Sequence, residues 1–160
     1  RLATFIYMKR IITLLLVLSA FIGITATAQQ PVRWRTTVKA TGADEGIVTF
    51  RALVSQGWHL YGLSLPENGP KPTTFDLAGS KDIKFTGKIK PARKAIEVDD
   101  PMFGMTLSWW DENIEFTVPF KITGAEPRLH CVISYMTCDG TTCRPPAKET
   151  ISTPIKLNNK

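Results

Sequence analysis

Alternation of apolar and polar residues is the feature that most limits what this chain can fold into. Apolar side chains occupy every second position in three long runs, 48–54, 114–120 and 129–135. A period of two places the two sets of side chains on opposite faces, so each run predicts a β-strand covered on one face. No convincing stripe at helical spacing occurs after residue 28. The chain is therefore expected to be all-β.

Shorter runs extend this pattern over the rest of the chain. They cover residues 33–39, 73–77, 83–89, 105–109 and 150–157, with turn signals such as Asn68-Gly69-Pro70 and Asp139-Gly140 between runs. About eight short strands with frequent turns predict an antiparallel β-sandwich. Pro119 has no backbone donor, so its strand is expected to be an edge strand or to carry a bulge.

Residues 1–28 have the composition of a secretory signal peptide. The basic pair Lys9-Arg10 precedes an uncharged run over 11–24, and that run leads to Ala26-Thr27-Ala28. A basic start, an apolar centre and an A-x-A exit predict export with cleavage, and residues 1–7 are interpreted as an upstream extension. An uncleaved membrane anchor is the alternative, because the apolar run and its exit approach the length of a span.

Residues 29–160 are expected to form a single exported domain. The net charge of +6 and the pI of about 9.4 are partly due to the basic leader. The remaining Lys and Arg residues are interspersed with Asp and Glu, which is typical of a solvated surface. Nucleic acid is therefore excluded as a partner.

Three cysteines carry the candidate chemistry. Thiols that lie close together in an exported protein tend to form disulfides, and an odd number leaves at least one unpaired. Cys131 shares a strand face with Leu129 and Ile133, so it is expected to be a buried free thiol.

Cys138 and Cys143 are separated by four turn-like residues and are followed by Pro145-Pro146. In a hairpin they would be cross-strand neighbours with α-carbons about 4.5–5.5 Å apart, within disulfide range. A structural staple is the usual role of such a pair, although a ring of about six residues contributes only roughly 2 kcal/mol. A reactive pair, held in a partly exposed site by the two prolines, is the other interpretation. The residues alone leave both open.

Zinc binding is a third interpretation of the same thiols. The candidate ligands are Cys131, Cys138, Cys143 and one of the histidines His59 and His130. No second Cys-x-x-Cys and no paired histidine is present, and adjacent strand residues point to opposite faces. We therefore expect no metal and no cofactor.

Tyr135-Met136-Thr137-Cys138 and, four residues later, Cys143-Arg144-Pro145-Pro146 form a distinctive motif. The motif resembles the active-site hairpin of the N-terminal periplasmic domain of DsbD-type thiol:disulfide interchange proteins, although its loop is one residue shorter than in the best-known members. Gly57-Trp58-His59-Leu60-Tyr61 is similar to the aromatic Gly-x-x-x-Tyr strand of that family. Asp99-Asp100-Pro101-Met102-Phe103-Gly104 is similar to the cap loop that covers its cysteines. The resemblance covers residues 32–157.

The resemblance implies an immunoglobulin-like β-sandwich in the periplasm that relays electrons between thiols. The implied donor is a membrane-embedded thiol reductase, and the implied acceptors are thioredoxin-like periplasmic disulfide oxidoreductases. Because the sequence ends at Lys160, we expect the reductase to be a separate chain. The domain is also expected to be a monomer. Disulfide correction and cytochrome c biogenesis both remain open as the downstream pathway.

The resemblance also implies roles for individual residues. Cys143 would form the mixed disulfides, and Cys138 would resolve them. Tyr61, Asp99 and Asp100 would line the site, and Met102 and Phe103 would form its cap. The alternative function is a non-catalytic exported β-sandwich binding module with a structural disulfide.

Overall fold

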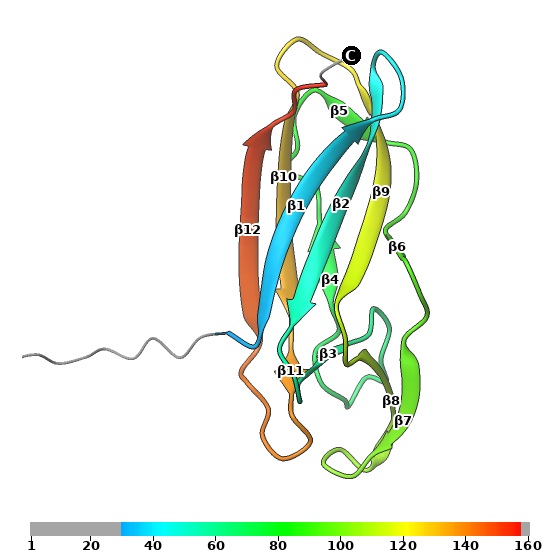
Figure 1. Cartoon of the computed structure of the whole chain (residues 1–160), viewed down its shortest axis with the longest axis vertical. Helices are drawn as coiled ribbons and strands as arrows, with labels where there is room; N and C mark the ends of the chain where they lie inside the picture. Colours follow the sequence, from blue (N-terminus) through cyan, green and yellow to red (C-terminus); the bar gives the residue numbers. More distant parts are fainter. Residues whose placement is uncertain (1–29, 158–160) are drawn as a thin grey trace, which may run out of the picture.

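The computed structural model describes residues 30–157. Within this range the chain forms twelve β-strands and no helix. The strands pair into three antiparallel sheets (Figure 1). The first has the order β1 (Val32–Ala40), β2 (Glu45–Val54), β9 (Ile114–Ile122) and β5 (Ile83–Phe85), with β6 (Lys90–Pro91) also paired to β9. The second is β12 (Ala147–Pro154), β10 (Arg128–Tyr135) and β4 (Thr74–Asp76). The third is β11 (Thr137–Cys138), β3 (His59–Tyr61), β8 (Met105–Trp110) and β7 (Ile96–Asp100).

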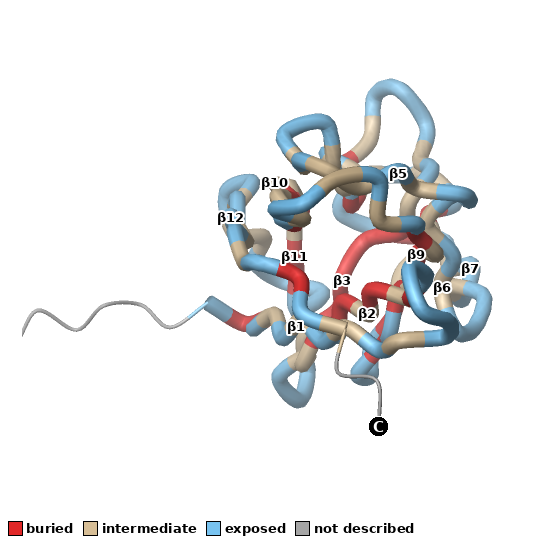
Figure 2. Tube along the Cα trace, turned by 90° about the horizontal axis from the view of Figure 1, so that it is seen from above, coloured by how far each residue is buried: buried red, intermediate tan, exposed pale blue. Residues whose placement is uncertain are grey.

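The main core lies between the first two sheets. It is built from the alternating apolar residues of the three long runs, namely Val48, Phe50, Ala52, Ile114, Phe116, Val118, Phe120, Leu129, Cys131, Ile133 and Tyr135. Phe75 on β4 of the second sheet packs against two rings of the first sheet. Its ring centroid lies 5.2 Å from that of Phe50 and 5.0 Å from that of Phe116. Buried segments lie inside and exposed segments outside in the view of Figure 2. The predicted all-β antiparallel sandwich is confirmed.

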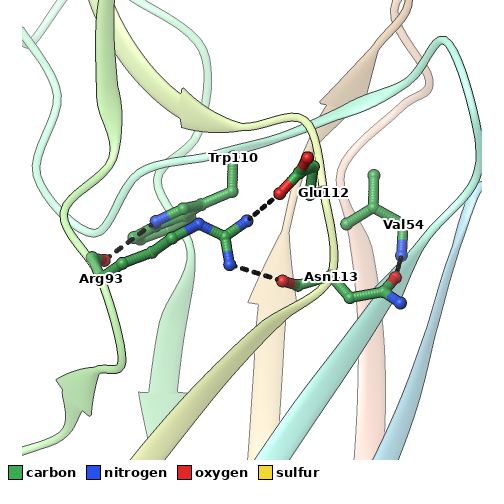
Figure 3. Close-up of polar contacts among 5 residues, drawn as sticks. All are labelled: Val54, Arg93, Trp110, Glu112 and Asn113. Carbon is green, nitrogen blue, oxygen red and sulfur yellow. Dashed lines mark hydrogen bonds and ion pairs between the residues drawn. The ribbon is translucent and has the colours of Figure 1, made fainter.

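Strands of the first two layers continue into the third sheet, which lies at one end of the sandwich, the lower end in Figure 1. Polar contacts around the turn between β8 and β9 join the parts (Figure 3). Arg93 donates through Nη1 to the carbonyl of Asn113 (2.8 Å), and Trp110 Nε1 donates to the carbonyl of Arg93 (3.2 Å). Asn113 Oδ1 accepts from the backbone N–H of Val54 at 2.9 Å. These contacts hold the third sheet in place relative to β2 and β9.

Pro119 lies in an interior strand, so of the two expected alternatives, an edge strand or a bulge, the edge strand is wrong. Strand β9 pairs with β2 on one side and with β5 and β6 on the other. The Pro119 carbonyl accepts from the N–H of Thr86 at 3.0 Å, on the side of β5 and β6. A residue in an antiparallel strand directs its nitrogen and its carbonyl to the same side. The missing donor therefore faces the break between β5 and β6, where no ladder bond is lost.

The predicted signal peptide, residues 1–28, lies outside the described part of the chain. Within residues 30–157, no helix is long and apolar enough to cross a membrane. The division into a leader and one domain over 29–160 stays a prediction.

Candidate functional site

The third sheet carries a disulfide between Cys138 and Cys143. The two residues form an antiparallel bridge, and their α-carbons are 4.1 Å apart. Asp139 shapes the turn, because its Oδ1 accepts from the backbone N–H groups of Thr141 (2.9 Å) and Thr142 (2.7 Å). The same hydrogen bonds lower the pKa of Asp139, which keeps the accepting carboxylate ionised. The hairpin and the disulfide predicted from spacing are confirmed.

The two sulfur-bearing residues differ in their access to solvent. Cys138 is 0% exposed, in a small apolar cluster with Tyr61 and Leu107, whereas Cys143 is partly exposed at the edge of that cluster. Disulfide exchange requires a thiolate to approach one of the two sulfurs directly. Of the two residues, only Cys143 has access to solvent.

Tyr61 connects the buried sulfur to a buried carboxylate. Its hydroxyl oxygen lies 3.2 Å from Cys138 Sγ and 3.2 Å from Asp100 Oδ2. A phenol has one proton, and a carboxylate is the stronger acceptor, so the hydroxyl donates to Asp100 in the oxidised protein. Burial, followed by the charge of Asp100, raises the pKa of Tyr61 well above its usual value. The hydroxyl therefore stays protonated, and its oxygen can accept from a reduced Cys138 thiol.

Asp100 also anchors the loop that links β7 to β8. The side chain is 5% exposed, and its Oδ1 accepts from the backbone N–H groups of Met102 (2.7 Å) and Phe103 (3.2 Å). The Asp100 carbonyl accepts from the N–H of Gly104 at 2.8 Å. Gly104 has a φ of 64°, in the left-handed region that glycine adopts without strain. One carboxylate thus fixes both the loop and the tyrosine hydroxyl.

Met102 and Phe103 pack on the disulfide and its surroundings. Met102 Sδ lies 4.0 Å from Cys143 Sγ, although the methionine is 45% exposed. Phe103 belongs to the small apolar cluster and lies edge-on to Tyr61, with centroids 6.2 Å apart. The cysteine loop and this loop are at the same end of the molecule in Figure 1. Both residues therefore contact the disulfide or the apolar cluster around it, and their role as a cap stays a prediction.

The structure does not bring Asp99 to the disulfide. Its side chain is exposed, and its Oδ1 accepts from Thr106 Oγ1 at 2.7 Å on the neighbouring strand. Consecutive residues of a strand face opposite sides, so Asp99 points outward where Asp100 points inward.

His59 belongs to the site, although sequence reasoning considered it only as a zinc ligand. It is the backbone partner of Cys138 and is 7% exposed. Its ring stacks on Trp109 at 4.2 Å and meets the Tyr61 ring edge-on at 5.0 Å. Burial lowers the pKa of His59, opposed in part by nearby carboxylates, so the ring is neutral at neutral pH. The period-two rule applied to residues 57–61 places His59 and Tyr61 on one face and could have found it.

Cys131 is not part of this site. It is a free cysteine that is 0% exposed in the main core on β10. Burial, with a smaller effect of Asp76, raises the pKa of its thiol to about 12, so the reactive thiolate is almost absent at neutral pH. The predicted buried free thiol is confirmed.

Comparisons with known proteins agree with this geometry. The sequence model of the family described as "Thiol:disulfide interchange protein DsbD, N-terminal" matches residues 26–155. No curated protein sequence matches the chain. The solved structure of the reduced Neisseria meningitidis DsbD N-terminal domain is similar over 76% of this chain and 84% of that chain, at 17% identity and a TM-score of 0.50.

A second solved structure, the N-terminal periplasmic domain of ScsB from Proteus mirabilis, is similar at 16% identity and a TM-score of 0.58. The match covers 81% of this chain and 48% of that chain. At such low identities these likenesses establish the fold alone. The predicted immunoglobulin-like sandwich is confirmed by the match to the DsbD N-terminal domain.

This β-sandwich with a disulfide in its cysteine hairpin has the fold and the cysteine pair of a thiol:disulfide interchange domain. The match over residues 26–155 places this chain plainly in the DsbD N-terminal family.

Proposed function

We propose that this domain exchanges its Cys138–Cys143 disulfide with thioredoxin-like proteins of the periplasm and receives electrons from a membrane-embedded thiol reductase. The observation that carries the proposal is the asymmetric disulfide, with Cys138 buried and Cys143 accessible at its rim. DsbD N-terminal domains interact with thioredoxin-like proteins and with the membrane core of DsbD, and this chain belongs to their family. The family and the periplasmic ScsB domain point to the periplasm as the location.

Reduction of the domain begins with attack by a donor thiolate on Cys143 Sγ. The new bond joins the donor sulfur to Cys143, and the Cys138–Cys143 bond breaks with its electron pair passing to Cys138. The second donor thiolate then attacks the donor's own sulfur, which releases Cys143 as a thiolate. The donor leaves as a disulfide, and the domain has gained two electrons.

Transfer to an acceptor runs through the same sulfur in the opposite direction. The Cys143 thiolate attacks the acceptor disulfide, forms a mixed disulfide and expels the other acceptor sulfur as a thiolate. Cys138, as its thiolate, then attacks Cys143 Sγ and releases the reduced acceptor. Cys138 is therefore the resolving cysteine, and it never needs to meet a partner directly.

Tyr61 and Asp100 control the proton on Cys138. A thiolate leaving into this buried site lies near the Asp100 carboxylate, and both burial and a like charge favour the neutral thiol. The thiol S–H can donate to the Tyr61 oxygen, while Tyr61 continues to donate to Asp100. This chain of hydrogen bonds stabilises Cys138 as a neutral thiol until it is deprotonated to resolve a mixed disulfide.

The cap limits access to the pair. Met102 contacts Cys143 Sγ. The backbone N–H groups of both cap residues donate to the Asp100 carboxylate. Dispersion and apolar burial hold such side chains in place, but the partly exposed methionine can move when a partner docks. The cap would thus slow reaction with small oxidants and reductants.

The reduction potential of the Cys138–Cys143 pair tests this function against the structural-staple alternative. Structural disulfides typically have potentials below about −300 mV, whereas exchange-active pairs lie higher. We expect a potential above that boundary, and loss of only about 1–3 kcal/mol of unfolding free energy in the Cys138→Ala/Cys143→Ala variant. A potential below the boundary together with failure of that variant to fold would support the staple instead.

A further inference from the structure

A polar hollow lies beside the disulfide and shares no lining residue with the cap. It has a volume of about 310 Å³ and is lined by Gln30, Pro31, Arg33, Ser55, Trp58 and Arg144. The backbone holds these segments together, because Ser55 N–H donates to the Pro31 carbonyl and Arg144 N–H donates to the Thr137 carbonyl, each at 2.9 Å. The hollow is therefore bounded by the residue that follows Cys143 and by the residue that precedes His59.

Two arginines and no carboxylate line this hollow. The Arg144 guanidinium lies over the ring of Trp58, with 5.5 Å between its Cζ and the ring centroid, a distance at which the cation and the ring attract each other. Arg144 Nε is buried and has no hydrogen-bond partner. Within residues 30–157, neither Arg33 nor Arg144 forms an ion pair.

The buried Nε is out of reach of an incoming molecule, but a half-buried guanidinium without an ion pair can bind an anion through its terminal nitrogens. The planar guanidinium matches a carboxylate, which can accept two parallel N–H bonds from it. The contact with Trp58 restricts the Arg144 guanidinium in advance, so less side-chain entropy is lost when an anion binds. The acceptor that fits this hollow is a carboxylate brought by another molecule.

We propose that this arginine pocket binds a carboxylate of the redox partner, carried on an acidic residue close in sequence to the partner's reactive cysteine. The inference rests on the proposed function, since a partner cysteine must first meet Cys143. Adjacent residues have α-carbons 3.80 Å apart, so Arg144 is within reach of a partner residue one or two positions from that cysteine. The pocket would select acidic partners through the rate of exchange.

Two cysteine peptides that differ only by Glu or Gln two positions from the cysteine provide the test. Each is reacted with the oxidised domain, and the rate of Cys143 mixed-disulfide formation is corrected for the thiolate fraction of the peptide. We expect the Glu peptide to react roughly fivefold faster, as one partly exposed ion pair allows. Arg144→Gln and Arg33→Gln should each reduce this preference, while Arg35→Gln, an equal loss of charge on the exposed face of β1, should keep it.

The outcomes separate the pocket from the function. Equal rates for both peptides, or equal loss of preference in Arg35→Gln, would overturn the pocket while exchange itself continued. Failure of both peptides to react would count against the proposed function. The rates for 3-mercaptopropionate, which carries a carboxylate, and for uncharged 2-mercaptoethanol show whether a small anionic thiol is preferred without a peptide. A preference there as large as that of the peptides would assign the pocket to a small anion and overturn the partner-peptide inference.

Discussion

The hydroxyl of Tyr61 lies between Cys138 Sγ and the Asp100 carboxylate, 3.2 Å from each. Tyr61→Phe keeps the ring packing but removes the acceptor for a reduced Cys138 thiol. A lost hydrogen bond of about 1 kcal/mol destabilises the reduced form and lowers the reduction potential by roughly 20 mV. Equilibration with a redox buffer measures the shift. An unchanged or raised potential would mean that the hydroxyl serves only to hold Asp100.

His59 makes the stability of the domain dependent on pH. Burial keeps its folded-state pKa below the usual histidine value of 6.5. The unfolded chain therefore binds the proton more tightly, and stability is lost as the pH falls through 6.5 toward the folded-state pKa. His59→Phe retains the stacking on Trp109 and should remove this loss.

Unfolding by denaturant at pH 7 and pH 5 measures the effect, with His130→Gln as the matched control that retains His59. Protonation of carboxylates also lowers the unfolding free energy over this pH range. The loss between pH 7 and pH 5 is therefore compared among the wild-type protein, His59→Phe and His130→Gln. Equal losses in the wild-type protein and His59→Phe would show that the histidine does not contribute.

At the scale of single elements, the cap loop carries the most specific prediction. Replacing Met102 and Phe103 with Ala should leave the sandwich folded, because neither belongs to the main core. Reduction of the disulfide by dithiothreitol should become several-fold faster, since a steric barrier has been removed. Ile96→Ala is the control, because Ile96 is as exposed as Met102 (46% and 45%) and lies outside the loop. An unchanged rate in a folded variant would show that these side chains are not a cap.

The long strands were predictable because each buries one face in a single core. In β2, β9 and β10 this leaves a regular alternation in the sequence, and all three predicted runs became strands. The third sheet leaves no such pattern. The three residues of β3 are all buried, and in β7 Ile96 is exposed while Asp100 is buried.

The same difference limited what could be predicted of the site. The disulfide followed from local spacing, since a tight turn determines which residues face each other. The contact of Asp100 with Tyr61 joins residues 39 positions apart and depends on the register of the third sheet. Without that register, Asp99 and Asp100 are indistinguishable in the sequence. Alternation places His59 on the same face as Tyr61, but its pairing with Cys138 does not follow from alternation alone.

At the scale of the whole molecule, stability and reactivity are in different places. The main core lies between the first two sheets, while Cys138 of the disulfide lies on β11, the edge strand of the third sheet. A short ring contributes little to stability, so the bond can be broken without loss of the fold. This separation allows the domain to be stable in both redox states.

Covalent trapping of a partner tests the central claim most directly. A purified thioredoxin-like domain with an intact disulfide is mixed with the reduced Cys138→Ala and Cys143→Ala variants. The mixed disulfides are separated on non-reducing gels and mapped by mass spectrometry. Cys131 is buried, so it should form no mixed disulfide in either variant.

Cys138→Ala should accumulate a mixed disulfide through Cys143, because the resolving thiol is missing, and Cys143→Ala should form almost none. Accumulation through Cys138 instead would reverse the assignment of the two cysteines. The absence of any mixed disulfide with either variant would contradict a role in thiol–disulfide exchange.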